Sequence, residues 1–227
     1  MENLKVIFED NHIIVVEKKP NIPSQSDKTG DIDMLTIVKQ YIKEKYNKPG
    51  NVYLGLVHRL DRPVGGVMIF AKTSKAASRL SNQVREKIFK KKYLAVVDGR
   101  FKEKEGSLED YLYKDERNNI SRVVNKEKKN SKLAKLDYKE LVYNEVKDLS
   151  LLEINLHTGR HHQIRVQLAN VGHSIFGDQK YGKRGQGKQI ALWAYELTIE
   201  HPITKEEITF KDFPEPIGTW CILKELK

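Results

Sequence analysis

The apolar run Val67–Ala71 (VMIFA) most constrains how this chain can fold. Its residues do not alternate with polar ones, a pattern typical of a strand that is buried on both faces. Gly65 and Gly66 stand immediately before the run, and glycines allow another backbone or a ligand to approach closely. The sequence therefore predicts a central strand at Val67–Ala71, with the preceding segment at the edge of the core.

A single carboxylate, Asp61, lies in this preceding segment between Arg59 and Arg62. In the simplest interpretation, Asp61 forms a salt bridge with a neighbouring arginine at the edge of a strand. A buried carboxylate is costly unless a cation pairs with it, and Arg165 from a second basic motif is a plausible partner. Such pairing would keep Asp61 ionised at neutral pH, as a nucleophile or a general base requires.

The charge of the chain favours a polyanionic partner. Its 227 residues include 41 Lys and Arg against 31 Asp and Glu, a net charge of +10. Basic side chains that replace the counterions of phosphates drive nucleic-acid binding, although a lysine-rich composition can also serve solubility. The sequence shows no apolar run long enough for a membrane span and no signal peptide, and its one cysteine, Cys221, has no disulfide partner. We therefore expect a cytoplasmic globular protein.

Periodicity predicts an α+β fold without regular βαβ alternation. The predicted strands are Val6–Glu9, Ile13–Glu17, Tyr93–Val97, Leu136–Val142, Leu149–Leu156 and a last one within 191–204. Asp33 and Ser74 are predicted to cap two helices. Their predicted buried faces are Leu35, Val38, Ile42 and Tyr46 in the first helix, and Ala77, Leu80, Val84 and Ile88 in the second. A third helical face comprises Ile164, Leu168 and Val171.

The histidines do not predict a metal site. His157 and His161 have the spacing of a ligand pair on a helix, but Thr158 and Gly159 between them indicate a turn. No acidic ligand stands nearby, so we expect no metal.

Four motifs in order resemble those of the RluA family of RNA pseudouridine synthases. They are HRLD at 58–61, KKYLAVVDG at 91–99, HTGRHHQIRVQLANVGHSIFGDQKYG at 157–182 and ALWAYELTIEHPIT at 191–204. The opening segment VIFEDNHIIVVEKKPNIPS also resembles the N-terminal hairpin of that family. The resemblance covers nearly the whole chain, and the ordered set is far more specific than any one motif.

This resemblance implies a pseudouridine synthase fold, in which a mixed, mostly antiparallel sheet with flanking helices and loops surrounds a central cleft. It implies a single catalytic domain over residues 1–227, without a separate N-terminal RNA-binding domain. The expected reaction is the isomerisation of specific uridines in structured tRNA or rRNA, with no cofactor and no metal. We expect the protein to act as a monomer.

The resemblance also implies roles for individual residues. Asp61 is the essential acid, Tyr93 stacks on the uracil, and Arg165 pairs with Asp61. Ile164 packs against the base. Arg59 fills the space left by the flipped uridine, or contacts a phosphate. The other expected RNA contacts are His58, Arg62, Arg160, His162 and Gln163.

Two other functions stay open at this point. A catalytically silent RNA-binding protein or chaperone could use the same scaffold, and its function would survive Asp61→Asn. A metal-dependent hydrolase could use the histidines, and a chelator would abolish its activity.

Overall fold

The structure is a computed structural model that describes residues 4–183 and 185–226. The chain divides into two compact units, which are described separately below. The first contains the residues up to Lys90 together with Ala194–Phe213, and the second contains Lys91–Trp193 together with the chain from Pro214 onward. The expectation of a single catalytic domain therefore stays a prediction.

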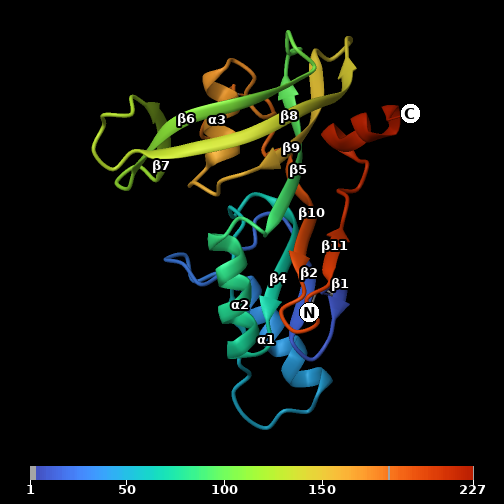
Figure 1. Ribbon diagram of the computed structural model, residues 1–227. Coiled ribbons are helices and arrows are strands. Elements are labelled where there is room, and N and C mark those ends of the chain that lie inside the picture. Colours follow the sequence, from blue (N-terminus) through green and yellow to red (C-terminus); the bar gives the residue numbers. More distant parts are fainter. Residues whose placement is uncertain (1–3, 184, 227) are drawn as a thin grey trace. The chain divides into compact units, whose positions relative to one another are not determined.

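The first unit is built on a sheet with the strand order β1-β2-β4-β10 (Figure 1). Two short strands join it, with β3 pairing β4 and β11 pairing β10. The strands are β1 (Val6–Glu9), β2 (Ile13–Lys18), β3 (Gly55–Leu56), β4 (Gly65–Ala71), β10 (Leu192–Glu200) and β11 (Glu207–Lys211). All residues of β4 are buried, and β4 lies between two partners. The prediction of a central strand is confirmed, as is the hairpin of β1 and β2.

The helix α1 (Met34–Lys45) begins as predicted, because the side chain of Asp33 accepts a hydrogen bond from the Thr36 N–H. Its buried residues are Met34, Val38 and Ile42. The predicted face was wrong at Tyr46, which follows the last turn and is 47% exposed.

The helix α2 (Ser74–Arg85) differs more from the prediction. Its cap is Thr73, which accepts from the Ala76 N–H, rather than Ser74. The buried residues are Ala76, Leu80 and Gln83, so the predicted face is rotated from the real one. Two residues predicted to be buried, Val84 and Ile88, are at the surface. Ala76 and Leu80 pack against one face of the sheet, where Val67 and Ile69 of β4 meet Leu197 and Ile199 of β10.

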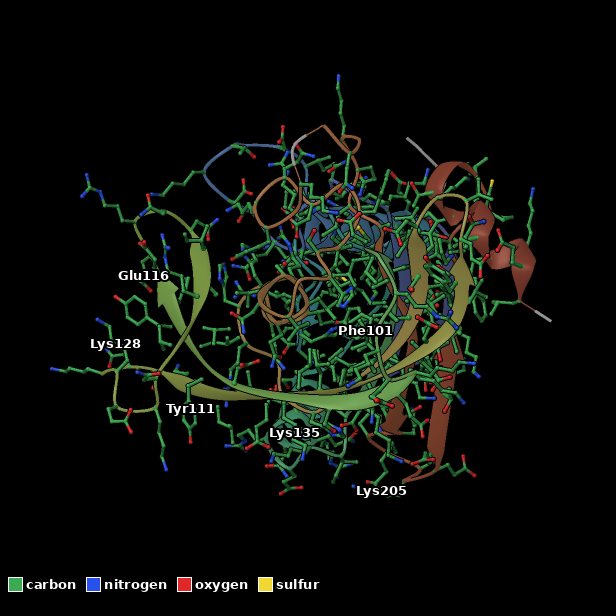
Figure 2. The ribbon with its side chains drawn as sticks, turned by 90° about the horizontal axis from the view of Figure 1, so that it is seen from above. Phe101, Tyr111, Glu116, Lys128, Lys135 and Lys205 are labelled. Atoms are coloured by element: carbon green, nitrogen blue, oxygen red, sulfur yellow. The ribbon has the colours of Figure 1, made fainter. Side chains whose placement is uncertain are left out.

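The second unit contains an antiparallel sheet with the strand order β5-β9-β8-β6-β7. These strands are β5 (Lys90–Asp98), β6 (Glu105–Asp115), β7 (Ile120–Val124), β8 (Lys132–Asn144) and β9 (Leu149–Leu156). The helix α3 (Gln163–Asn170) contacts β6 and β7, and a 3-10 helix, η1 (Gly218–Glu225), contacts β8. Figure 2 shows Tyr111 and Lys135 along the curved ribbon of β6 and β8, with Glu116 and Lys128 near its far end.

The predicted strands at Tyr93–Val97, Leu136–Val142 and Leu149–Leu156 are confirmed as parts of β5, β8 and β9. The strands β6 and β7 were not predicted from the sequence. The α+β class is confirmed. Within residues 4–183 and 185–226, no helix has the length and apolar character needed to cross a membrane.

Candidate active site

Asp61 stands in a tight turn that leads into β4. Its carbonyl accepts a hydrogen bond from the Val64 N–H at 3.0 Å. The loop after β2 anchors the residues on both sides of it. Ser24 Oγ donates to the Leu60 carbonyl at 2.9 Å and accepts from the Leu60 N–H at 3.2 Å. The Asn21 N–H donates to the Arg62 carbonyl at 2.8 Å. The backbone therefore holds Asp61 in a defined position at the end of a buried strand.

A fully buried lysine, Lys18, forms hydrogen bonds with the same turn. Its Nζ donates to the carbonyls of Lys19 (3.2 Å), Arg62 (2.9 Å) and Val64 (2.6 Å). An ammonium group has three N–H donors, so these carbonyls match its capacity. Burial lowers the pKa of Lys18 to about 7, while the Asp61 charge opposes this shift and the Arg62 charge adds to it. Lys18 was not predicted as a site residue from the sequence.

The lowered pKa of Lys18 predicts a pH dependence of stability. Its pKa in the folded protein is about 7, below the 10.5 expected in the unfolded chain. Between these values the unfolded state binds more protons, so the contribution of Lys18 to the free energy of unfolding rises with pH. Between about pH 7 and pH 9, we expect the free energy of unfolding of wild type to rise by about 2 kcal/mol relative to that of Lys18→Met.

Urea denaturation of both proteins at the two pH values measures this difference. Lys19→Met, at the exposed neighbouring position, is the matched control. Its free energy of unfolding should change between the two pH values as much as that of wild type. Equal pH dependence of wild type and Lys18→Met would contradict the prediction.

His58 and Arg62, two of the expected RNA contacts, are both engaged within the first unit. His58 is only 9% exposed. Its Nε2 accepts from the Ile69 N–H of β4 at 3.1 Å, and its ring packs on Phe89. This burial favours a structural role for His58 over the predicted RNA contact, because little of its ring reaches the surface.

Arg62 fixes the loop that follows β2. Its Nε donates to the Asn21 carbonyl at 3.2 Å and its Nη1 to Thr29 Oγ1 at 3.0 Å, and its Nη2 pairs with Asp31. The RNA contact of Arg62 stays a prediction. Arg59, on the other side of Asp61, is exposed.

In the second unit, Tyr93 lies on β5 and is 7% exposed. Its register partner across the sheet is Ile154 of β9. Ile164, the expected base-pocket residue, lies on α3 and is also buried.

Gln163 shapes the turn before α3. Its Oε1 accepts from Thr158 Oγ1 at 2.7 Å and from the Arg160 N–H at 3.0 Å, and its Nε2 donates to the Lys135 carbonyl at 3.1 Å. This engagement favours a structural role over the predicted RNA contact. Arg160 is exposed, with its Nε donating to the Leu133 carbonyl at 2.9 Å.

His162 caps α3 with a φ of 52°, in the left-handed region that non-glycine residues seldom adopt. Its buried side chain places Nδ1 2.9 Å from the Tyr181 hydroxyl. His162 therefore links α3 to the loop that carries Tyr181.

Arg165 is 4% exposed and forms a two-point ion pair with Asp178. Its Nε donates to Asp178 Oδ2 and its Nη2 to Asp178 Oδ1, both at 2.7 Å. Burial raises the pKa of Asp178, but hydrogen bonds from Arg165 and from the N–H groups of Lys180 and Tyr181 outweigh it and lower the pKa overall. From the sequence, Asp61 was the predicted partner of Arg165, and the pairing with Asp178 was not predicted.

The chemistry of these residues divides between the units. Asp61 and Arg59 belong to the first unit, and Tyr93, Ile164 and Arg165 belong to the second. Among residues 4–183 and 185–226, no three His, Cys, Asp or Glu side chains cluster as metal ligands would. The first unit offers a carboxylate in a fixed turn, which suits acid–base or nucleophilic work, and the second offers a buried, paired guanidinium, which suits charge compensation and hydrogen-bond donation.

Comparison with known proteins supports the same class of chemistry. A sequence model described as RNA pseudouridylate synthase matches residues 12–170. "Uncharacterized RNA pseudouridine synthase YhcT" of Bacillus subtilis is 33% identical over 225 residues, covering 96% of this chain and 71% of the relative. "Ribosomal large subunit pseudouridine synthase D" of Nitrosomonas europaea is 31% identical over 237 residues, covering 99% of this chain and 65% of the relative.

A solved structure, "Human RNA Pseudouridylate Synthase Domain Containing 1", has the same fold. It matches with a TM-score of 0.76 at 24% identity, over 96% of this chain and 85% of the human one. The expected pseudouridine synthase fold is thereby confirmed. The chain belongs to the RNA pseudouridylate synthase family, as its RluA-type motifs predicted, and is an isomerase that acts on RNA.

Proposed function

We propose that this protein isomerises specific uridines to pseudouridine in structured tRNA or rRNA, with Asp61 as the essential aspartate. The observation that carries the proposal is the position of Asp61 in the HRLD motif. Backbone and side-chain hydrogen bonds anchor its neighbours Leu60 and Arg62 in a turn at the end of β4.

The reaction breaks the bond between the ribose and the ring nitrogen, turns the base, and forms a carbon–carbon bond to the same ribose carbon. It is an isomerisation, so no atom or electron is gained or lost overall. Asp61 serves as nucleophile or general base, and both roles require its carboxylate at a fixed distance from the reacting nucleoside. The anchored turn supplies this preorganisation.

The remaining site residues hold the base while it is detached. Tyr93 stacks on the uracil and assists proton transfer at the ring carbon. Ile164 packs against the base, and Arg165 pairs with Asp61.

A uridine in folded RNA must leave its stack before it can react. Extrusion costs a few kcal/mol, and less for a base that is already unstacked. The exposed guanidinium of Arg59 occupies the vacated space and stacks on the neighbouring bases. The net charge of +10 supports binding of the RNA backbone.

We expect Arg59→Ala to slow conversion of a structured RNA by about 10- to 100-fold, because the cost of extrusion is no longer offset. The same variant should lose much less with a short unstructured oligonucleotide. Single-turnover rates on both substrates measure this ratio. Arg85→Ala, at another exposed arginine of the first unit, is the matched control. Equal losses on both substrates would contradict the role of Arg59 and indicate a phosphate contact.

The name of the Nitrosomonas relative refers to the large ribosomal subunit, which supports rRNA as one substrate of this chain. The test is to incubate the purified protein with total RNA from cells that lack the gene and to map pseudouridine in every RNA class. New sites in rRNA or tRNA identify the substrate. A catalytically silent protein would produce no new site in any class.

A further inference from the structure

The ion pair of Arg165 is part of a larger network in the second unit. Asp178 is fully buried, and it is fixed by more than the guanidinium. Its Oδ1 also accepts the N–H groups of Lys180 at 2.8 Å and Tyr181 at 3.2 Å. Its carbonyl accepts the Gly182 N–H at 2.9 Å. The carboxylate is therefore held in one orientation by its own loop.

The loop that carries Asp178 is itself tightly placed. Gly177 has a φ of +74°, and a Cβ there would come within 2.1 Å of the Gln189 carbonyl oxygen. Only glycine permits this approach of two backbones. The position of Asp178 thus follows from the backbone.

Tyr181 restrains the same guanidinium from another direction. Its ring centre lies 5.3 Å from the Arg165 guanidinium carbon, within the range of a cation–π contact. Its hydroxyl accepts the Ser121 N–H of β7 at 2.6 Å and lies 2.9 Å from His162 Nδ1. Asp178 and Tyr181 therefore connect Arg165 of α3 to the loop that carries them both, and Tyr181 connects this loop to β7.

We propose that Asp178 and Tyr181 are positioning residues, which hold the Arg165 guanidinium in the orientation that the reaction uses. The inference rests on the proposed function, because it takes Arg165 as part of the site. A guanidinium has five N–H donors, and the two-point pair with Asp178 engages two of them. Because that pair fixes the plane of the group, it also fixes the direction of the other three.

The pair also sets the charge that Arg165 presents. A buried guanidinium without a carboxylate partner is costly, and Asp178 supplies the neutralising charge within the second unit. Asparagine at position 178 would keep the shape and one acceptor but lose the charge and the two-point geometry. Arg165 would then reorient.

The experiment compares wild type, Asp178→Asn, Tyr181→Phe and Asp110→Asn. Asp110 is the matched control, since its Oδ2 also binds an α3 side chain, Gln167 Nε2 at 2.7 Å, but not Arg165. Single-turnover conversion of RNA with excess enzyme gives a rate constant, and a filter-binding assay gives Kd. The NMR signal of the Arg165 Nε–H, assigned through Arg165→Lys, reports the guanidinium directly.

We expect Asp178→Asn to lower the rate constant by about 100-fold with little change in Kd. Tyr181→Phe should cause a smaller loss, and Asp110→Asn should match wild type. The Arg165 Nε–H signal should shift or broaden in Asp178→Asn but stay unchanged in Asp110→Asn. A purely structural role of Asp178 would reduce the amount of folded, active enzyme without changing the rate constant.

An unchanged rate constant in Asp178→Asn would overturn the inference, as would equal losses in Asp178→Asn and Asp110→Asn. If wild type itself converts no uridine, the proposed function has failed. The NMR arm still decides the positioning in that case, because an unchanged Nε–H signal in Asp178→Asn would overturn it independently.

Discussion

Asp61→Asn is expected to lower the rate of pseudouridine formation by at least about 1,000-fold, the scale seen when an essential catalytic group is removed. The amide has nearly the shape of the carboxylate but cannot act as a nucleophile or general base at neutral pH. The turn is anchored through the backbone groups of Leu60 and Arg62, not through the Asp61 side chain, so the substitution leaves these contacts in place. Single-turnover assays with the RNA identified as substrate measure the loss.

The loss must come from the chemistry and not from folding or binding. We expect Asp61→Asn to unfold at the same urea concentration as wild type and to bind RNA with a similar Kd. Asp27→Asn is the matched control, because Asp27 is an exposed carboxylate of the same unit that faces Arg62. Its rate should stay close to that of wild type. Substantial activity in Asp61→Asn would contradict the catalytic role and favour the silent RNA-binding alternative.

Gly66→Ala is expected to cause the largest loss of stability among single substitutions in the first unit. Gly66 has a φ of +124°, where any side chain is strained. A Cβ would also lie 2.2 Å from the carbonyl oxygen of Ala194 on β10 and 2.6 Å from its nitrogen. Backbone atoms inside a sheet cannot move aside, so we expect a loss above about 4 kcal/mol, at the diagnostic end of the range for single substitutions.

Urea denaturation, or the yield of folded protein where the variant does not accumulate, measures this effect. Gly50→Ala is the matched control, since a Cβ at Gly50 meets nothing within 4 Å. It should unfold like wild type. If Gly66→Ala unfolds within about 1 kcal/mol of wild type, the backbone contact does not have the importance assigned to it.

The sequence predicted best where one physical cause dominated. The unbroken apolar run of β4 required burial on both faces, and the glycines before it predicted the close backbone approach that Gly66 makes to Ala194. The helix α2 was harder because Thr73 and Ser74 are both good caps, and either could have been the first. Thr73 caps the helix. The buried face was mispredicted because a polar residue, Gln83, is buried in place of Val84, with its side-chain amide hydrogen-bonded to the backbone of Glu200.

The strands β6 and β7 escaped prediction for a different reason. In β6, charged and other polar side chains interrupt the apolar ones, and half-buried positions alternate with exposed ones over much of its length. Such a strand buries only part of its surface, so it lacks the apolar run by which β4 was found.

The candidate site shows the same division. Asp61, Tyr93 and Arg165 were singled out because the resemblance gives each of them a role. Lys18 and Asp178 also lie in the segments that resemble the family, but the sequence does not show the contacts that each makes in the fold. Lys18 binds carbonyls 44 and 46 residues away, and no side-chain pattern records an interaction with a backbone carbonyl.

Pseudouridine mapping of total cellular RNA tests the central claim most directly. Three strains are compared, one with the gene, one without it, and one that carries only Asp61→Asn. The proposed function predicts that one or a few sites disappear in the deletion and stay absent with Asp61→Asn. If no site changes in the deletion, or if the lost sites return with Asp61→Asn, the claim that Asp61 catalyses uridine isomerisation is contradicted.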